Sequence, residues 1–187
     1  EKLSAFVNWE DRNTCILFGD GAGAAVLRHA KEGEGSIIAT EMGTDGDQTH
    51  LLNIPGGGSA CPITTENADQ RLASLAMLGK EVFKHAVTRM RDSANKVIER
   101  ACLTPDEIKL VIPHQANLRI IDAIAERLAV PNDRVFVNLH KYGNTSAAAV
   151  AIALDEAHRT GRFERGDNIV LVAFGAGLTW AAAVIEW

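Results

Sequence analysis

Residues 111–117 constrain the fold of this chain more than any other segment. The apolar residues 110–112 predict a buried strand that ends at Pro113, and His114 follows directly. A helix is expected next, because apolar side chains recur at helical spacing at Ile120, Ile121, Ile124 and Leu128. Open α/β sheets place ligand sites at the carboxyl ends of their strands. From this segment alone, a structural histidine in the core is as good an interpretation as a functional one.

The composition bounds the class of protein. The chain has 187 residues, 47% apolar and 23% charged, which suits one sizeable globular core or two small ones. A net charge of −5 argues against a nucleic-acid-binding protein. We expect a cytoplasmic protein without membrane contact, because no signal peptide opens the chain and no apolar run reaches the roughly 18 residues of a membrane span. The three cysteines lack metal-ligand spacing and fit a reducing compartment.

The rest of the sequence alternates strand and helix patterns, as α/β proteins do. Strands are expected at residues 14–18, 24–27, 36–41, 51–54, 109–112, 134–138, 168–174 and 178–185. Helices are expected over residues 67–103, after His114, and over residues 147–158. Thr104 begins a capping box with Glu107, which predicts a short helix before the histidine strand. Residues 43–65 are rich in Gly, Asp, Thr and Pro and indicate a long loop.

Two glycine-rich turns resemble each other across the chain. Residues 19–23 (GDGAG) suggest a dinucleotide-binding loop, but that interpretation fails because the motif must open a helix and residues 24–27 continue as a strand. Instead, residues 18–21 (FGDG) precede an alanine-rich strand, as residues 174–177 (FGAG) do. The two turns lie 156 residues apart, a typical domain length. This similarity predicts two equivalent halves: the end of the first at residues 1–30 and the whole second at residues 31–187.

Two polar turns complete the pattern. Residues 113–117 (PHQAN) and 142–146 (YGNTS) each put a hydrogen-bonding side chain before a helix. Together with the two glycine turns, these segments occur along the chain in the order found in the thiolase-like condensing enzymes. The four motifs resemble that family, most closely its 3-oxoacyl-[acyl-carrier-protein] synthase III members. The resemblance covers the whole chain. It implies an α/β fold of two similar halves, with helices layered between mixed sheets, of which roughly the first 130 residues are missing here.

The resemblance also implies an activity. In this family an acyl group moves from coenzyme A to the cysteine of a Cys-His-Asn triad, and malonyl-acyl-carrier protein is then decarboxylated. The resulting carbanion attacks the acyl-cysteine in the Claisen condensation that starts a fatty acid. His114 and Asn144 match the two polar partners and would donate hydrogen bonds to the thioester oxygen as it becomes an enolate. Acyl-CoA is then a substrate, and no cofactor or metal is expected.

Further residues acquire roles through the same resemblance. The backbone N–H of Ala176 would be an oxyanion donor, at a position where the family is expected to carry glycine. The wall of the coenzyme A channel and the contacts to the carrier arm would include Asn117, Gly79, Phe83, Ala86 and Ile120. A docking surface for an acidic carrier protein would include Lys84, Arg119 and Arg127, for which a solvated helix face is the alternative.

The nucleophile is missing from the pattern. None of Cys15, Cys61 and Cys102 lies in a turn like the family's Ala-Cys-Ala/Gly, and each is better explained as a small apolar residue. We therefore expect this chain to pair with the missing first half, which would supply the cysteine, or to form a homodimer. Two alternatives stay open: a related starter-unit synthase of secondary metabolism, and a non-catalytic module that binds acyl-CoA or carrier protein.

Overall fold

The computed structural model describes residues 1–31 and 33–187. In chain order the α-helices and strands are α1 (Arg12–Cys15), β1 (Ile37–Thr44), β2 (Leu52–Asn53), β3 (Ala76–Met77), α2 (Gly79–Arg100), β4 (Ile108–Pro113), α3 (Leu118–Arg127), α4 (Leu139–Tyr142), α5 (Ala148–Arg159), β5 (Asn168–Gly175) and β6 (Thr179–Glu186). None of the helices in the described part of the chain has the length and apolar character that crossing a membrane requires.

A mixed four-stranded sheet, in the order β1-β6-β5-β4, forms the centre of the molecule. Strand β6 is antiparallel to both β1 and β5, whereas β4 runs parallel to β5. Pro113 at the end of β4 pairs with Val172 near the end of β5, so the carboxyl ends of these parallel strands lie together. The residues that follow them, His114 and the turn 176–178, therefore share one edge of the sheet.

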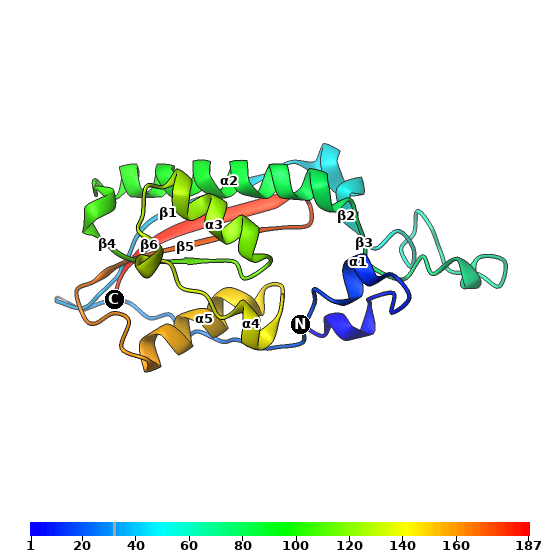
Figure 1. The fold of residues 1–187 in the computed structure, drawn as a ribbon, viewed down its shortest axis with the longest axis horizontal. Helices are drawn as coiled ribbons and strands as arrows, with labels where there is room; N and C mark the ends of the chain where they lie inside the picture. The colour runs from blue at the N-terminus through cyan, green and yellow to red at the C-terminus, as the bar shows by residue number, and fades with distance from the viewer. Residues whose placement is uncertain (32) are drawn as a thin grey trace.

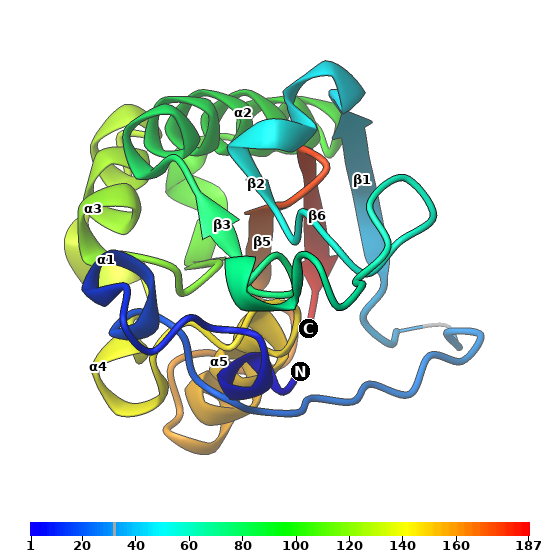
Figure 2. The same ribbon diagram turned by 90° about the vertical axis from the view of Figure 1, so that its right-hand side faces the viewer.

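Helices cover both faces of this sheet (Figures 1 and 2). Helix α2, with α3 beside it, packs on one face, and α5 lies on the other face against β4 and β5. The side of α2 that meets the sheet is apolar at helical spacing, with Ala86, Met90 and Val97 buried. In α5 the buried positions are alanines, among them Ala153 and Ala157, whose small size lets the helix backbone lie close to the strands.

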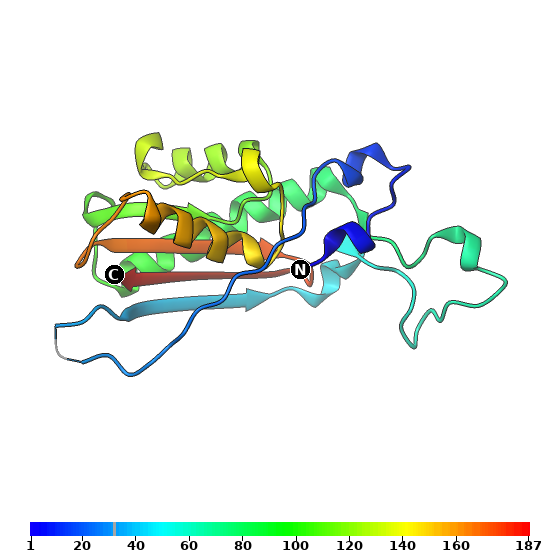
Figure 3. The same cartoon turned by 90° about the horizontal axis from the view of Figure 1, so that it is seen from below.

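The predicted hairpin at residues 14–27 is wrong. Residues 12–15 form the short helix α1, and residues 21–31 run as an extended chain along the outside of the molecule without a strand partner (Figure 3). Val26 and Leu27 are 95% and 78% exposed there. The apolar pattern of residues 24–27 favours a strand, but a strand needs a neighbour to pair its backbone groups. The described residues offer this segment none.

Two other boundaries differ from the sequence-based expectation. Helix α2 begins at Gly79 rather than near residue 67, because residues 76–77 pair with β2 and the Leu75 N–H donates to the Phe6 carbonyl at 2.7 Å. The strand expected at residues 134–138 is reduced to a single bridge between Val135 and Val111. In both places tertiary contacts override a local pattern. Strands β4, β5 and β6, helix α5 and the Thr104 capping box are confirmed.

Candidate active site

His114 lies directly after β4, at the edge of the sheet. Its backbone N–H donates to the Val172 carbonyl at 2.8 Å, which extends the β4–β5 pairing by one residue and fixes the backbone that carries the imidazole. The residue is 9% exposed, and burial lowers the pKa of His114 from 6.5 to about 4. Neither imidazole nitrogen forms a hydrogen bond to residues 1–31 or 33–187. At neutral pH this side chain is an uncharged ring whose N–H is free to donate.

Asn144 follows the single turn of α4 and the left-handed Gly143, which has a φ of 68°. Its backbone bonds to a second segment: the Asn144 N–H donates to the Leu17 carbonyl, and the Gly19 N–H donates to the Asn144 carbonyl, both at 2.9 Å. Its side-chain Oδ1 accepts from the Ser146 N–H at 2.9 Å. A backbone N–H can only donate, so the amide must face Ser146 with its oxygen, and its NH2 group remains free.

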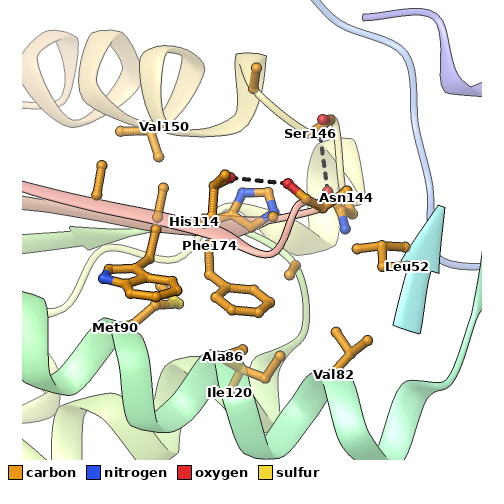
Figure 4. Close-up of a pocket in the computed structure, with 18 of the residues that line it drawn as sticks. Leu52, Val82, Ala86, Met90, His114, Ile120, Asn144, Ser146, Val150 and Phe174 are labelled. Carbon is orange, nitrogen blue, oxygen red and sulfur yellow. Dashed lines mark hydrogen bonds between the residues drawn. The ribbon is translucent and has the colours of Figure 1, made fainter. Parts of the chain in front are cut away.

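Both side chains face the same cavity, which has a volume of about 900 Å³ (Figure 4). The cavity lies between α2 and α3 on one side and the β5–β6 turn on the other. Its walls are mostly apolar and include Val82, Met90, Phe174 and Trp180. A cleft of this size, with a few polar groups converging on it, is typical of a binding site for a small molecule or an acyl chain.

Ala176 also lines this cavity, in the turn between β5 and β6. Its carbonyl accepts from the Thr179 hydroxyl at 3.0 Å, which holds the turn closed. Ala176 is not among the described residues with a positive φ. The alanine therefore needs no conformation that is reserved for glycine, and its side chain causes no backbone strain.

The residues expected along the coenzyme A channel divide into two groups. Ala86 of α2 and Ile120 of α3 line the cavity. Gly79, Phe83 and Asn117 are not among its described lining residues. A Cβ at Gly79 would meet only the Met77 side chain, at 3.8 Å, so no contact within residues 1–31 and 33–187 requires a glycine there. Asn117 instead caps α3, because its side chain accepts from the Arg119 N–H at 2.9 Å.

The three basic residues expected to dock a carrier protein are all exposed on α2 and α3. Lys84 is paired with Glu81 of the same helix at 3.0 Å. The Arg119 guanidinium lies over the Phe83 ring, 5.5 Å from its centre. Helices α2 and α3 pack side by side, so these residues lie on adjoining helices that also wall the cavity.

The three cysteines lie away from the cavity, and none of them lines it. Cys15 ends α1, which corrects the strand placement expected from the sequence. Cys61 lies in the long loop, and the exposed Cys102 follows α2 with a φ of 56°. No thiol of the described chain is therefore placed to attack a substrate held near His114.

Sequence reasoning missed several residues that shape this site. Ser146, which orients Asn144, has a left-handed φ of 52° that no sequence pattern announces. Trp180 packs its ring on Gly43, where an added Cβ would lie 2.4 Å from the ring. Gln115 is 2% exposed and makes several backbone hydrogen bonds. Its one signal was a long polar side chain beside a buried strand.

Comparison with known proteins identifies relatives of this chain. Residues 98–187 match the family model described as the C-terminal part of 3-oxoacyl-[acyl-carrier-protein (ACP)] synthase III. Residues 1–46 match a second family model, described as 3-oxoacyl-[acyl-carrier-protein (ACP)] synthase III. A beta-ketoacyl-[acyl-carrier-protein] synthase III from Caldanaerobacter subterraneus subsp. tengcongensis is 54% identical over 187 residues, which is 100% of this chain and 56% of that relative. The chain thus spans about half the length of the curated relatives it matches.

Solved structures of the same enzyme family superpose on this chain. The 3-oxoacyl-[acyl-carrier-protein] synthase III of Aquifex aeolicus VF5 superposes with a TM-score of 0.88 at 46% identity, over 100% of this chain and 56% of that one. The corresponding synthase of Thermus thermophilus superposes with a TM-score of 0.87 at 46% identity, over 99% and 56% of the two chains. These likenesses confirm the thiolase-like α/β fold predicted from the sequence. The chain therefore belongs to the 3-oxoacyl-[acyl-carrier-protein] synthase III family.

Proposed function

We propose that the protein containing this chain is a condensing enzyme that starts fatty-acid chains from an acyl-CoA primer and malonyl-acyl-carrier protein. The observation that carries the proposal is the placement of His114 and Asn144, whose side chains face one apolar cavity with free N–H donors. Membership of the family adds the reaction class. A module that only bound acyl-CoA would need the cavity but not this pair of donors.

The two side chains suit the decarboxylation step. Loss of CO2 from the malonyl group leaves an electron pair on an enolate, whose oxygen carries the developing negative charge. Donors aimed at that oxygen in a cavity shielded from water stabilise the transition state by about 3–4 kcal/mol each. The enolate carbon then attacks the acyl-cysteine carbonyl, the new carbon–carbon bond forms, and the cysteine leaves as a thiolate. The N–H of Ala176 would serve the tetrahedral oxygen of that last step.

The nucleophilic cysteine would come from the half of the enzyme that this chain does not include. Two features of the chain support such a partner. Cys15, Cys61 and Cys102 all lie outside the cavity lining. The extended segment 21–31 exposes Val26 and Leu27, as a strand without its neighbours would. We assign residues 1–30 to the end of the first half and residues 31–187 to the second half.

The remaining assignments concern partners. Gly79, Phe83, Ala86 and Ile120 would lie along the pantetheine, and Asn117 would contact the carrier arm. Lys84, Arg119 and Arg127 would attract the acidic carrier protein to helices α2 and α3. We further propose that the enzyme is a cytoplasmic homodimer, with no nucleic-acid or membrane partner and acyl-CoA as a substrate rather than a resident cofactor.

Acyl labelling tests the reaction directly. The full-length protein is incubated with acetyl-CoA, digested, and examined by mass spectrometry for an acylated cysteine. We expect the label on a cysteine outside residues 1–187. A label on Cys15, Cys61 or Cys102 would refute our account of the nucleophile. Coenzyme A binding without any label would instead favour a non-catalytic binding module.

The two half-reactions test the assigned roles. In the full-length enzyme, His114→Ala and Asn144→Ala should each lower the rate of malonyl-carrier-protein decarboxylation by about 100- to 1,000-fold, because each removes one donor to the enolate. Acyl transfer from acyl-CoA to the cysteine should fall far less. Equal losses in both half-reactions would show that these side chains do not act on the enolate.

A further inference from the structure

We propose that Gln115 is a positioning residue of the condensing reaction, whose side-chain amide holds the His114 turn (residues 113–117) and the segment leading to Asn144 in one arrangement. The inference rests on the proposed function. Gln115 itself is not among the described lining residues of the cavity. Its role would be to fix the two donors relative to each other.

All hydrogen-bonding positions of the Gln115 amide are occupied. Its Nε2 donates to the Pro113 carbonyl at 2.8 Å and to the Phe136 carbonyl at 3.1 Å. Its Oε1 accepts from the backbone N–H groups of Asn138 at 2.9 Å and Leu139 at 3.2 Å. Two donors and two acceptors are the full capacity of a primary amide. A side chain that is 2% exposed requires such satisfaction, and only glutamine offers it at this length.

These bonds join the two catalytic segments. On one side, Gln115 is the next residue after His114, whose backbone is already fixed to Val172 of β5. On the other side, Leu139 begins α4, and its N–H is one of the helix donors that lack a partner within the helix. The residue before α4 provides no side-chain cap, so the Gln115 oxygen is the cap of α4. After one helical turn the chain reaches Asn144.

Contacts with α5 also hold α4 and the residue before it in place. The Asn138 side chain donates to the Glu156 carboxylate of α5 at 2.9 Å, and Lys141 of α4 pairs with the same carboxylate. The Lys141 ammonium and the Asn138 amide hold the pKa of Glu156 below its usual range, so this carboxylate stays ionised at neutral pH. Helix α4 is thus fixed at its start by Gln115 and along its length by α5. Helix α4, held by these contacts, ends at Tyr142, two residues before Asn144.

The test uses the full-length enzyme with Gln115→Met, which keeps the length of the side chain and removes all four hydrogen bonds. The kcat of malonyl-carrier-protein decarboxylation should fall about 10- to 100-fold, as expected when catalytic groups shift by up to about 1 Å. Acyl transfer to the cysteine should stay near the wild-type rate, because it does not use the enolate donors. Val97→Ala is the matched control, since it truncates a buried side chain of α2 that is not among the described lining residues. This control should lower the melting temperature without changing the ratio of the two half-reactions.

The variant Gln115→Glu gives an independent test of the positioning role. The carboxylate keeps its accepting contacts but faces the Pro113 and Phe136 carbonyls without a proton to donate. Burial raises the pKa of such a carboxyl group, so mild acid should protonate it and restore one donor. Decarboxylation by this variant, relative to wild type at the same pH, should therefore recover as the pH falls. If Gln115→Met fails to fold, this pH profile carries the test.

The outcomes separate the two proposals. A folded Gln115→Met enzyme with an unchanged ratio of half-reactions, or a Gln115→Glu ratio that does not change with pH, would overturn the positioning role and leave the condensing activity intact. Equal loss of both half-reactions would make Gln115 a merely structural residue. A wild-type enzyme that does not decarboxylate malonyl-carrier protein would overturn the proposed function itself.

Discussion

The pH dependence of stability offers the sharpest check on the environment of His114. In the unfolded chain this imidazole binds a proton below about pH 6.5, and in the folded protein only below about pH 4. Between these values the unfolded state binds more protons, so the free energy of unfolding rises with pH and is lost as the pH falls. One pKa unit corresponds to about 1.4 kcal/mol, so the loss attributable to His114 is about 2 kcal/mol at pH 5 and about 3 kcal/mol at pH 4.

The perturbation is His114→Gln, which removes the titrating group from the full-length enzyme. Urea unfolding at several pH values between 7 and 4 gives the difference in the free energy of unfolding between variant and wild type. We expect this difference to shift in favour of the variant by about 2 kcal/mol between pH 7 and pH 5. His140→Gln, which removes an exposed imidazole from α4, controls for the loss of one histidine. A difference that is independent of pH, or an NMR titration of His114 near 6.5, would refute the reasoning.

Three further predictions concern the cavity and its surroundings in the full-length enzyme. Ala86→Trp should raise the KM for acyl-CoA at least tenfold in steady-state assays, because the indole would occupy the cavity; an unchanged KM would place the substrate elsewhere. Gly43→Ala should lower the free energy of unfolding by about 1–3 kcal/mol in urea titrations, because its Cβ would lie 2.4 Å from the Trp180 ring; full stability would contradict this contact. Arg119→Glu should lower kcat/KM for malonyl-carrier protein at low salt but not at high salt, whereas Arg165→Glu, before β5, should not; equal effects would refute the docking surface.

The sequence predicted the histidine segment well because its local signals and its tertiary contacts agree. The apolar residues of β4 are buried on both sides of the sheet, and Pro113 does end the strand. Asn117 then caps α3 with its own side chain. Where propensity, burial pattern and capping all point to one structure, a single sequence suffices to predict that structure.

The errors arose where the structure depends on a distant partner. Residues 24–27 have a strand pattern, yet the described chain provides no strand beside them. The role of Gln115 depends on backbone groups 21 to 24 residues away, which no local pattern reveals. The orientation of Asn144 depends on the left-handed backbone of Ser146. The residue types of the site were visible in the sequence, but the contacts that aim them were not.

The uncharged state of His114 has a consequence for catalysis under the proposed function. A protonated imidazole would attract the malonyl carboxylate before it leaves, and so would stabilise the ground state as well as the transition state. An uncharged N–H interacts weakly with the neutral thioester oxygen and strongly with the enolate oxygen, so its stabilisation grows as the reaction proceeds. Burial beside β5 keeps His114 uncharged by lowering the pKa of its imidazole to about 4, and the same burial lowers the free energy of unfolding in acid. The same burial thus explains both the predicted loss of folding stability in acid and the neutral state of the His114 donor.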